Sequence, residues 1–250
     1  MSMSHVEFTK EMKKTHTILV PMMLPIHFQF LRNILCKEGY RVEILKTEGQ
    51  QIIDEGLKNV HNDTCYPALL VIGQMIDALK SGKYDTAHIA LAITQTGGGC
   101  RASNYIHLLR KALVQAGFEH VPVISVNFSQ LEKNSGFKLT PKMLLRLLYA
   151  FLYGDMLMWI KNQCKPYELE KGSTDALVTT WIDTITAQFD SLSYMRMKHN
   201  YQEMLHDFAA LPRSQKPKIQ VGIVGEIYMK YAPLGNNELE RSEEHRVGKE

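Results

Sequence analysis

Residues Ile89 to Tyr105 read IALAITQTGGGCRASNY, and this stretch decides the fold that the sequence predicts. An apolar run from Ile89 to Ile93 predicts a buried strand, and a helical pattern begins directly after three glycines and Cys100. Such a strand, glycine turn and helix start place backbone N–H groups and one thiol at the carboxyl edge of a parallel sheet. In open α/β sheets, ligands bind at that edge.

The rest of the chain alternates strand and helix patterns. Strands are expected over 17–22, 41–45, 87–93 and 121–126, and helices over 25–37, 65–80, 101–116, 140–163 and most of 174–210. The alternation predicts an α/β fold with a parallel, doubly wound sheet of the Rossmann or flavodoxin type and long helices. The helix over 140–163 is apolar around much of its circumference, so we expect it to be largely buried.

The sequence also suggests how the chain is divided. We expect a first α/β domain over 15–165 that contains Cys65 and Cys100, and a helical connection over 166–217. Residues 218–240 then resemble the first strand of a second α/β domain that the chain does not complete. The last ten residues, RSEEHRVGKE, are almost wholly polar, and we interpret 241–250 as a non-native tail on a fragment.

Composition excludes few classes of protein. With 250 residues, 45% hydrophobic and 22% charged, the chain is typical of soluble globular proteins. A formal charge of +3 without a basic cluster does not predict nucleic-acid binding. No apolar run approaches the ~20 residues of a membrane span, and the start of the chain lacks a signal-peptide pattern. We therefore expect a cytoplasmic protein.

The four cysteines are Cys36, Cys65, Cys100 and Cys164, and no two of them form a C-x-x-C motif. A disulfide framework and a local zinc motif are therefore not predicted. Cys36 falls in the last turn of its helix, where we expect a packed, inert thiol. Cys65 falls in the first turn of its helix, where the helix dipole stabilises a thiolate. Burial as a small apolar side chain explains Cys65 equally well.

The glycine turn is compatible with several chemistries. Gly97 to Ala102 satisfies the dinucleotide pattern G-x-G-x-x-A, but the next strand ends at Asn127 without the acidic residue that holds a ribose. A phosphate loop would need Gly-Lys-Ser/Thr, which is missing, although exposed N–H groups leave phosphate binding open.

Cys100 is also a candidate nucleophile, because it begins a helix and precedes Arg101. Such an enzyme needs a base within reach of the thiol. No sequence feature brings any of the candidate bases to Cys100; these are His61, His88 and His107.

Metal binding explains more of the pattern. Cys65 and Cys100 stand at two helix starts that would converge on one crevice, where helix dipoles and N–H···S contacts favour an anionic iron–sulfur cluster. The three glycines, Gly97, Gly98 and Gly99, allow close backbone approach. Two cysteines leave such a cluster incomplete, so a further ligand has to come from another domain, a substrate or a water. The helix expected over 101–116 begins with three polar side chains, Arg101, Ser103 and Asn104. These side chains either contact sulfur, carbonyl or phosphate groups, or only cap the helix.

Four segments carry a resemblance to a known family. NDTCYPA, TQTGGGCRASNY, VPVISVNFS and VGIVGEIYMKYAPLGNN resemble the cluster-bearing region of acyl-CoA dehydratase activase-related proteins, which are relatives of the 2-hydroxyglutaryl-CoA dehydratase subunits. The resemblance spans about residues 17–237. It implies a 4Fe–4S cluster held between two α/β domains by three cysteines. It also implies an ATP-hydrolysing activator that delivers one electron at low potential, so that a 2-hydroxyacyl-CoA forms a ketyl radical and expels water.

Carried onto this sequence, the resemblance makes Cys65 and Cys100 the first two metal ligands. The third is expected in the second domain, and Cys164, which precedes that domain, is a poor substitute. The implied partners are an ATP-hydrolysing activase and an acyl-CoA-type substrate, with no nucleic acid and no membrane. The implied activity is that of a lyase or of one component of an ATP-coupled reductase, and we expect the fragment to be inactive alone. The alternative is a non-redox nucleotide- or CoA-binding module that uses Gly97–Gly99.

Overall fold

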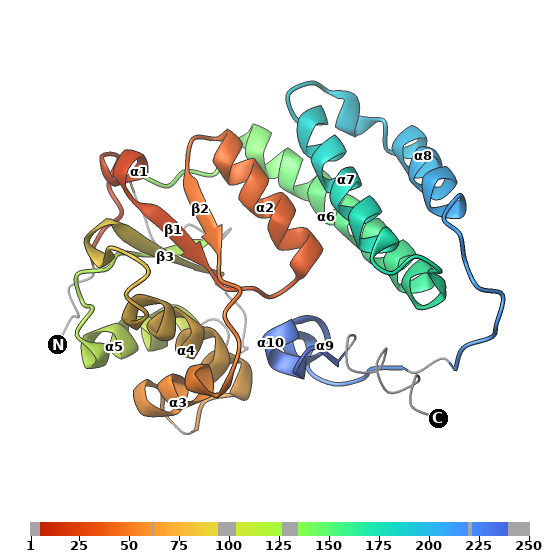
Figure 1. Ribbon diagram of the computed structural model, residues 1–250. Coiled ribbons are helices and arrows are strands. Elements are labelled where there is room, and N and C mark those ends of the chain that lie inside the picture. Colours follow the sequence, from red (N-terminus) through yellow and green to blue (C-terminus); the bar gives the residue numbers. More distant parts are fainter. Residues whose placement is uncertain (1–5, 62, 95–103, 127–134, 220–221, 240–250) are drawn as a thin grey trace. The chain divides into compact units, whose positions relative to one another are not determined.

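The computed structural model describes residues 6–61, 63–94, 104–126, 135–219 and 222–239 (Figure 1). Its contacts divide the chain into two compact units. The first unit combines Met1–Met23, Leu35–Lys138 and Glu226–Glu238, and the second combines Leu24–Ile34, Leu139–Gly225 and Leu239–Glu250. This division differs from the predicted boundaries, because the long helix expected in the first domain packs with the later helices of the second unit.

The first unit is built on four parallel strands in the order β2-β1-β3-β4, which confirms the predicted α/β fold with a parallel sheet. The strands are β1 (Thr17–Val20), β2 (Arg41–Ile44), β3 (Ile89–Thr94) and β4 (Val123–Val126). The first five residues of β3 are buried, as expected for the centre of a covered parallel sheet. Because β2 and β4 lie on opposite sides of the β1–β3 pair, the strand order reverses between β1 and β3. Ligands bind at such a switch point.

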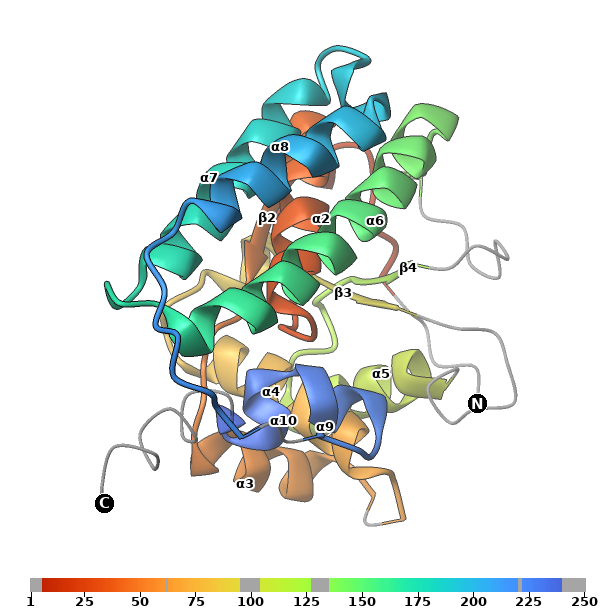
Figure 2. The ribbon, with the colours of Figure 1, turned by 90° about the vertical axis from the view of Figure 1, so that its right-hand side faces the viewer.

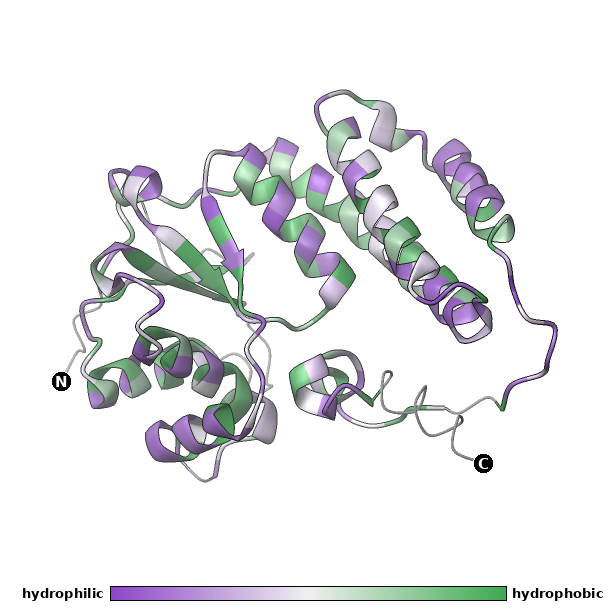
Figure 3. Ribbon diagram, in the orientation of Figure 1, coloured by the Kyte–Doolittle hydropathy of each residue, from purple (hydrophilic) through white to green (hydrophobic). Residues whose placement is uncertain are grey.

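Three helices of the first unit, α3 (Gln50–Asn59), α4 (Tyr66–Lys80) and α5 (Tyr105–Ala116), cover one face of the sheet (Figures 1 and 2). Alternate side chains of the strands, such as Leu19 and Leu91, join the buried cluster beneath these helices. Helix α4 is central to this core, since twelve of its 15 residues are buried. Its ribbon is accordingly coloured as hydrophobic along most of its length (Figure 3).

Helices α3 and α4 touch backbone to backbone at two glycines. A Cβ atom added to Gly73 would lie 2.1 Å from the carbonyl oxygen of Ile52, and one added to Gly56 would lie 2.5 Å from the carbonyl oxygen of Leu69. Real Cβ atoms do not approach backbone oxygens this closely. The two glycines therefore set the distance between the two helices.

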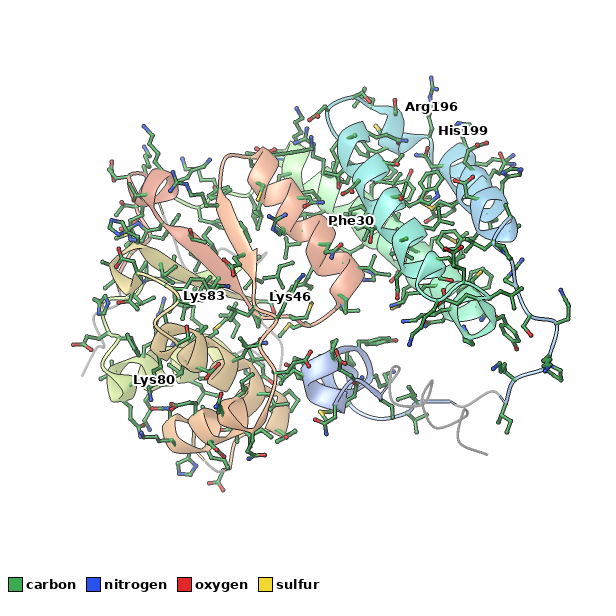
Figure 4. The ribbon with its side chains drawn as sticks, in the orientation of Figure 1. Phe30, Lys46, Lys80, Lys83, Arg196 and His199 are labelled. Atoms are coloured by element: carbon green, nitrogen blue, oxygen red, sulfur yellow. The ribbon has the colours of Figure 1, made fainter. Side chains whose placement is uncertain are left out.

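The second unit is helical. It contains the first part of α2 (Pro25–Lys37), then α6 (Pro141–Cys164), α7 (Ser173–Gln188) and α8 (Met197–Ala209). Phe30 of α2 packs edge-on against Phe189, with ring centroids 6.4 Å apart (Figure 4). The guanidinium of the buried Arg146 on α6 donates to the Phe189 carbonyl, with 2.5 Å between Nη2 and the oxygen. The described residues also form the short helices α1 (Met12–Thr15), α9 (Ile227–Tyr231) and α10 (Pro233–Asn236), together with 3-10 turns at Thr86–His88, Lys165–Tyr167 and Ser193–Met195.

Helix α6 departs from the sequence-based expectation of burial. It exposes five large apolar side chains, Leu145, Leu148, Phe151, Leu152 and Trp159. By length and composition alone, Pro141–Tyr167 is the one span in the described part of the chain that is long and apolar enough to cross a membrane, with 39% of its most apolar window buried. The expectation that no run approaches this length was therefore wrong. A core helix of a soluble protein passes the same test.

Two further expectations differ from the structure. The described residues of the apolar run at 219–224 are not part of a strand and pair with no strand among the described residues, and Ile219 and Val224 are almost fully exposed. Cys36 is exposed rather than packed. It lies two residues, or about 200° of helix, from the buried Ile34, and so on the opposite side of α2.

His16 predicts a pH dependence of the first unit. Its ring is 9% exposed and lies 5.6 Å, centroid to centroid, from His88, which pairs with Asp85 at 2.6 Å. Burial first, and then the charge of His88, lowers the pKa of His16, while Asp85 acts in the opposite sense. The unfolded chain therefore takes up this proton at a higher pH than the folded chain does. Stability from His16 is complete above its unfolded pKa of 6.5 and is lost as pH falls below it.

We expect the free energy of unfolding, from urea titrations at pH 7, 6 and 5, to fall by no more than about 1.4 kcal/mol per pH unit through this group. His16→Gln should flatten that slope, whereas the matched change at the exposed His206 should preserve it. Equal slopes for the wild type and His16→Gln would contradict the assignment.

Candidate functional site

The switch point of the sheet lies at the carboxyl ends of β1 and β3. Strand β3 ends at Thr94, and the predicted glycine turn follows it directly in the sequence. Six of the predicted site residues fall outside the described residues: Gly97, Gly98, Gly99, Cys100, Arg101 and Ser103. The described part of the site therefore consists of what borders this segment, namely the start of α5 and the elements that contact it.

The sequence predicted that Cys65 lies in the first turn of α4. In the structure it is instead the N-cap of that helix, one residue earlier. Its backbone is extended (φ −66°, ψ 147°), and its carbonyl oxygen accepts from the N–H groups of Ala68 at 3.0 Å and Leu69 at 3.3 Å. The thiol makes no capping hydrogen bond and is half-buried. It thus lies at the positive end of a 15-residue helix.

The thiol of Cys65 lies within hydrogen-bond distance of a buried side chain, Tyr105. The Sγ atom lies 3.0 Å from the Tyr105 hydroxyl oxygen, and either atom can be the donor. Tyr105 is the first residue of α5 and is 7% exposed. This contact joins the starts of α4 and α5, which are 40 residues apart in the sequence. It also connects the Cys65 motif with the helix that follows the glycine turn.

Asn104, the remaining described residue of the predicted set, is the N-cap of α5. Its side chain is exposed and makes no capping hydrogen bond. The amide is therefore available to solvent at the start of α5, next to Tyr105. Neither of its two proposed roles, ligand contact or plain capping, is tested by this arrangement.

A second buried tyrosine, Tyr228, comes from the far end of the chain. Tyr228 lies on α9, whose following helix α10 contacts α4, and it belongs to the same core cluster against which Cys65 packs. Its side chain is 7% exposed, and its hydroxyl has no hydrogen-bond partner among the described residues. Burial first, and then the neighbouring Glu226 and Tyr66, raises the pKa of Tyr228 far above its ordinary value.

Sequence reasoning assigned no role to Tyr105 or to Tyr228. Both stand inside segments that carried the family resemblance, but neither has a spacing that predicts a contact with sulfur. The Tyr105 contact with Cys65 and the burial of Tyr228 both depend on tertiary packing between helices far apart in the sequence. The available signal was limited to an aromatic residue with a hydroxyl at the start of an apolar helix pattern.

Cys164 and the candidate bases make no described contact with Cys65. Cys164 is buried in the second unit, with Arg213 Nη1 3.7 Å from its sulfur. The three histidines named as bases do not contact Cys65 among the described residues. His61 pairs with Asp63, His88 pairs with Asp85, and His107 is exposed on α5. The nucleophile interpretation concerns Cys100, which lies outside the described residues, so it stays a prediction.

The described residues hold no group of three or more His, Cys, Asp or Glu side chains that could bind a metal ion. Cys65 supplies a donor of the right chemistry for an iron–sulfur cluster, because its sulfur is partly exposed, stands at a helix N-terminus and has a hydroxyl within hydrogen-bond distance. In this respect the site fits a thiolate ligand. Comparison with known proteins adds nothing to this description: no protein-family model, no curated protein and no solved structure matches the chain.

Proposed function

We propose that this chain is the iron–sulfur-binding module of a 2-hydroxyacyl-CoA dehydratase-like or CoA enzyme activase-related protein, with Cys65 and Cys100 as ligands of a 4Fe–4S cluster. The observation that carries the proposal is the 3.0 Å contact between the Cys65 sulfur and the Tyr105 hydroxyl. This contact joins Cys65, one predicted ligand, to α5, the helix that follows Cys100 in the sequence.

Chain connectivity limits how far apart the two sulfurs can be. Cys100 precedes Tyr105 by five residues, and five residues span at most about 18 Å even when fully extended. Because Tyr105 touches Cys65, this limit is compatible with Cys100 as a second ligand of the same cluster. Cys36 and Cys164 have no comparable link to Cys65. Of the three other cysteines, Cys100 is therefore the favoured second ligand.

The surroundings of Cys65 favour an anionic sulfur. The helix dipole at the start of α4 stabilises negative charge at its N-cap. A hydrogen bond from the Tyr105 hydroxyl to a cluster-bound sulfur would add to this effect, since such bonds raise the potential of a cluster by stabilising its reduced form. Tyr105 is buried, so this hydroxyl is held in place rather than exchanging freely with water.

When bound, a low-potential 4Fe–4S cluster supplies single electrons to substrates that are hard to reduce, such as thioesters. In the proposed function, an ATP-hydrolysing activase domain or subunit delivers the electron, and an acyl-CoA-type compound receives it. Gly97 to Gly99 allow close approach of the backbone, while Arg101, Ser103 and Asn104 contact sulfur, carbonyl or phosphate groups. A further ligand comes from another domain, a substrate or a water. The proposed setting is the cytoplasm, where thiols stay reduced.

Anaerobic reconstitution tests the proposal. The full chain is incubated with iron, sulfide and a reductant, desalted, and analysed for bound iron and acid-labile sulfide. Bound iron and sulfide in equal amounts, with absorption near ~400 nm, are the expected result. A chain that retains neither element but binds a nucleotide or CoA in equilibrium dialysis would overturn the proposal and favour the non-redox module that uses Gly97–Gly99.

A further inference from the structure

Helix α6 carries two apolar stripes instead of one. One stripe is buried against the rest of the second unit and includes Met143, Leu147, Ala150 and Leu157. The other is exposed and consists of Leu145, Leu148, Leu152 and Trp159, with Phe151 at its edge. We call the exposed set the α6 stripe.

The spacing of the α6 stripe places it on one side of the helix. At 100° per residue, Leu145, Leu148, Leu152 and Trp159 fall within a sector of roughly 60°, on the side opposite the buried residues. Steps of three, four and seven residues are those of a seam that pairs with another helix. Surface helices of globular proteins carry polar residues on this side.

The α6 stripe is large for an exposed surface. Leu148, Phe151 and Trp159 each expose more than half of their surface, and Leu145 and Leu152 each expose 38%. Together these five side chains expose on the order of 500 Å² of apolar area, comparable with the largest patch on a typical monomer. Two described contacts reach its border: the Tyr201 hydroxyl of α8 donates to the Leu152 carbonyl at 2.8 Å, and the ring of His27 on α2 lies 5.8 Å from that of Phe151, centroid to centroid.

The charges on and near the α6 stripe disfavour a lipid bilayer as its partner. Asp155 lies at the edge of the stripe, pairs with His27 at 3.0 Å, and has a side chain that is 70% exposed. An ionised aspartate near the middle of a membrane span costs about 3 kcal/mol. The opposite side of α6 is packed on other helices, and it contains the buried Arg146. A protein surface accommodates an apolar stripe bordered by a charged carboxylate better than the hydrocarbon of a bilayer does.

We propose that the α6 stripe is the interface of a two-fold symmetric dimer in which α6 of one copy lies antiparallel to α6 of a second copy. Leu145 and Trp159 are each seven residues from Leu152, so an axis near Leu152 places Leu145 opposite Trp159 of the partner subunit. A small side chain then faces a large one at both ends. Two stripes of about 500 Å² bury about 1,000 Å², the lower limit for a stable interface. This inference does not depend on the cluster.

Analytical ultracentrifugation of the full chain, from ~1 to ~100 µM, tests the dimer. The expected result is a reversible dimer whose Kd rises about tenfold or more in the variant Leu148→Glu/Leu152→Glu. The matched control is Leu205→Glu, which changes an exposed leucine of α8 and should leave the Kd unchanged. Circular dichroism confirms that all three proteins are folded.

Cross-linking tests the proposed symmetry. In a Cys36→Ser background, which removes an exposed thiol, Leu152→Cys lies on the axis and should form a disulfide with its own copy under mild oxidation. Leu145→Cys, far from the axis, should not. A monomer at all concentrations would overturn the proposal. So would co-sedimentation of the monomer with neutral phosphatidylcholine vesicles that the double glutamate variant abolishes, which would identify a membrane surface instead.

Discussion

Replacing Cys65 with serine is expected to remove the absorption near ~400 nm and the bound iron of the anaerobically reconstituted chain, and Cys100→Ser is expected to do the same. A serine hydroxyl is a much weaker ligand for iron than a thiolate, and with two ligands from this chain the loss of either leaves only one. Bound iron, normalised to protein, should fall to the level of an unreconstituted control in both variants.

Two controls separate ligand loss from misfolding. Cys36→Ser changes an exposed thiol of the same unit and should keep the full absorption. Tyr105→Phe removes only the hydroxyl that contacts the Cys65 sulfur, so it should retain iron. Equal loss of iron in all four variants would indicate general misfolding. Full retention in Cys65→Ser would show that this thiol does not bind the cluster.

The parallel sheet was predictable because its strands are short apolar runs separated by helical patterns. Ile89–Thr94 is buried over its first five residues, and only a central strand of a covered sheet tolerates such a run. The strand order was not predictable in the same way. No residue in β1 specifies that β3 rather than β4 lies beside it, because parallel strands with similar apolar faces are interchangeable at the level of pattern.

For the site, the sequence predicted positions but not contacts. Helix periodicity placed Cys65 at the start of α4 to within one residue, since the apolar pattern of that helix is long and regular. It did not predict the contact with Tyr105, because that contact depends on how α4 and α5 pack against each other on the same face of the sheet. The error at Cys36 has a related cause: a short apolar helix leaves the buried side ambiguous by one or two residues.

Apolar composition was misleading where no partner is present. The run at 219–224 has the pattern of a strand, but β structure requires a neighbouring strand to satisfy its backbone groups, and the described residues of this run pair with none. The α6 stripe shows the same principle in a helix. An apolar pattern predicts that a surface seeks burial, and the partner that buries it has to come from the tertiary or quaternary structure.

The second large effect is expected from Gly73→Ala, which should lower the free energy of unfolding by about 2 to 3 kcal/mol. The added methyl group would meet the Ile52 carbonyl oxygen at 2.1 Å and the Gly56 nitrogen at 2.9 Å, so α3 and α4 have to move apart. Both atoms belong to backbone, which cannot rotate away as a side chain does. The higher helix propensity of alanine, worth about 1 kcal/mol, offsets only part of this cost.

Urea unfolding followed by far-UV circular dichroism measures this change, and Gly222→Ala is the matched control. Gly222 has no atom within 4 Å of an added Cβ, so its substitution should stay within about 0.5 kcal/mol of the wild type. Both tryptophans, Trp159 and Trp181, lie in the second unit, so their fluorescence reports that unit separately. Because Gly73 belongs to the core of the first unit, the circular dichroism transition should shift more than the fluorescence transition. Equal midpoints for Gly73→Ala and Gly222→Ala would show that the glycine contact does not set the separation of α3 and α4.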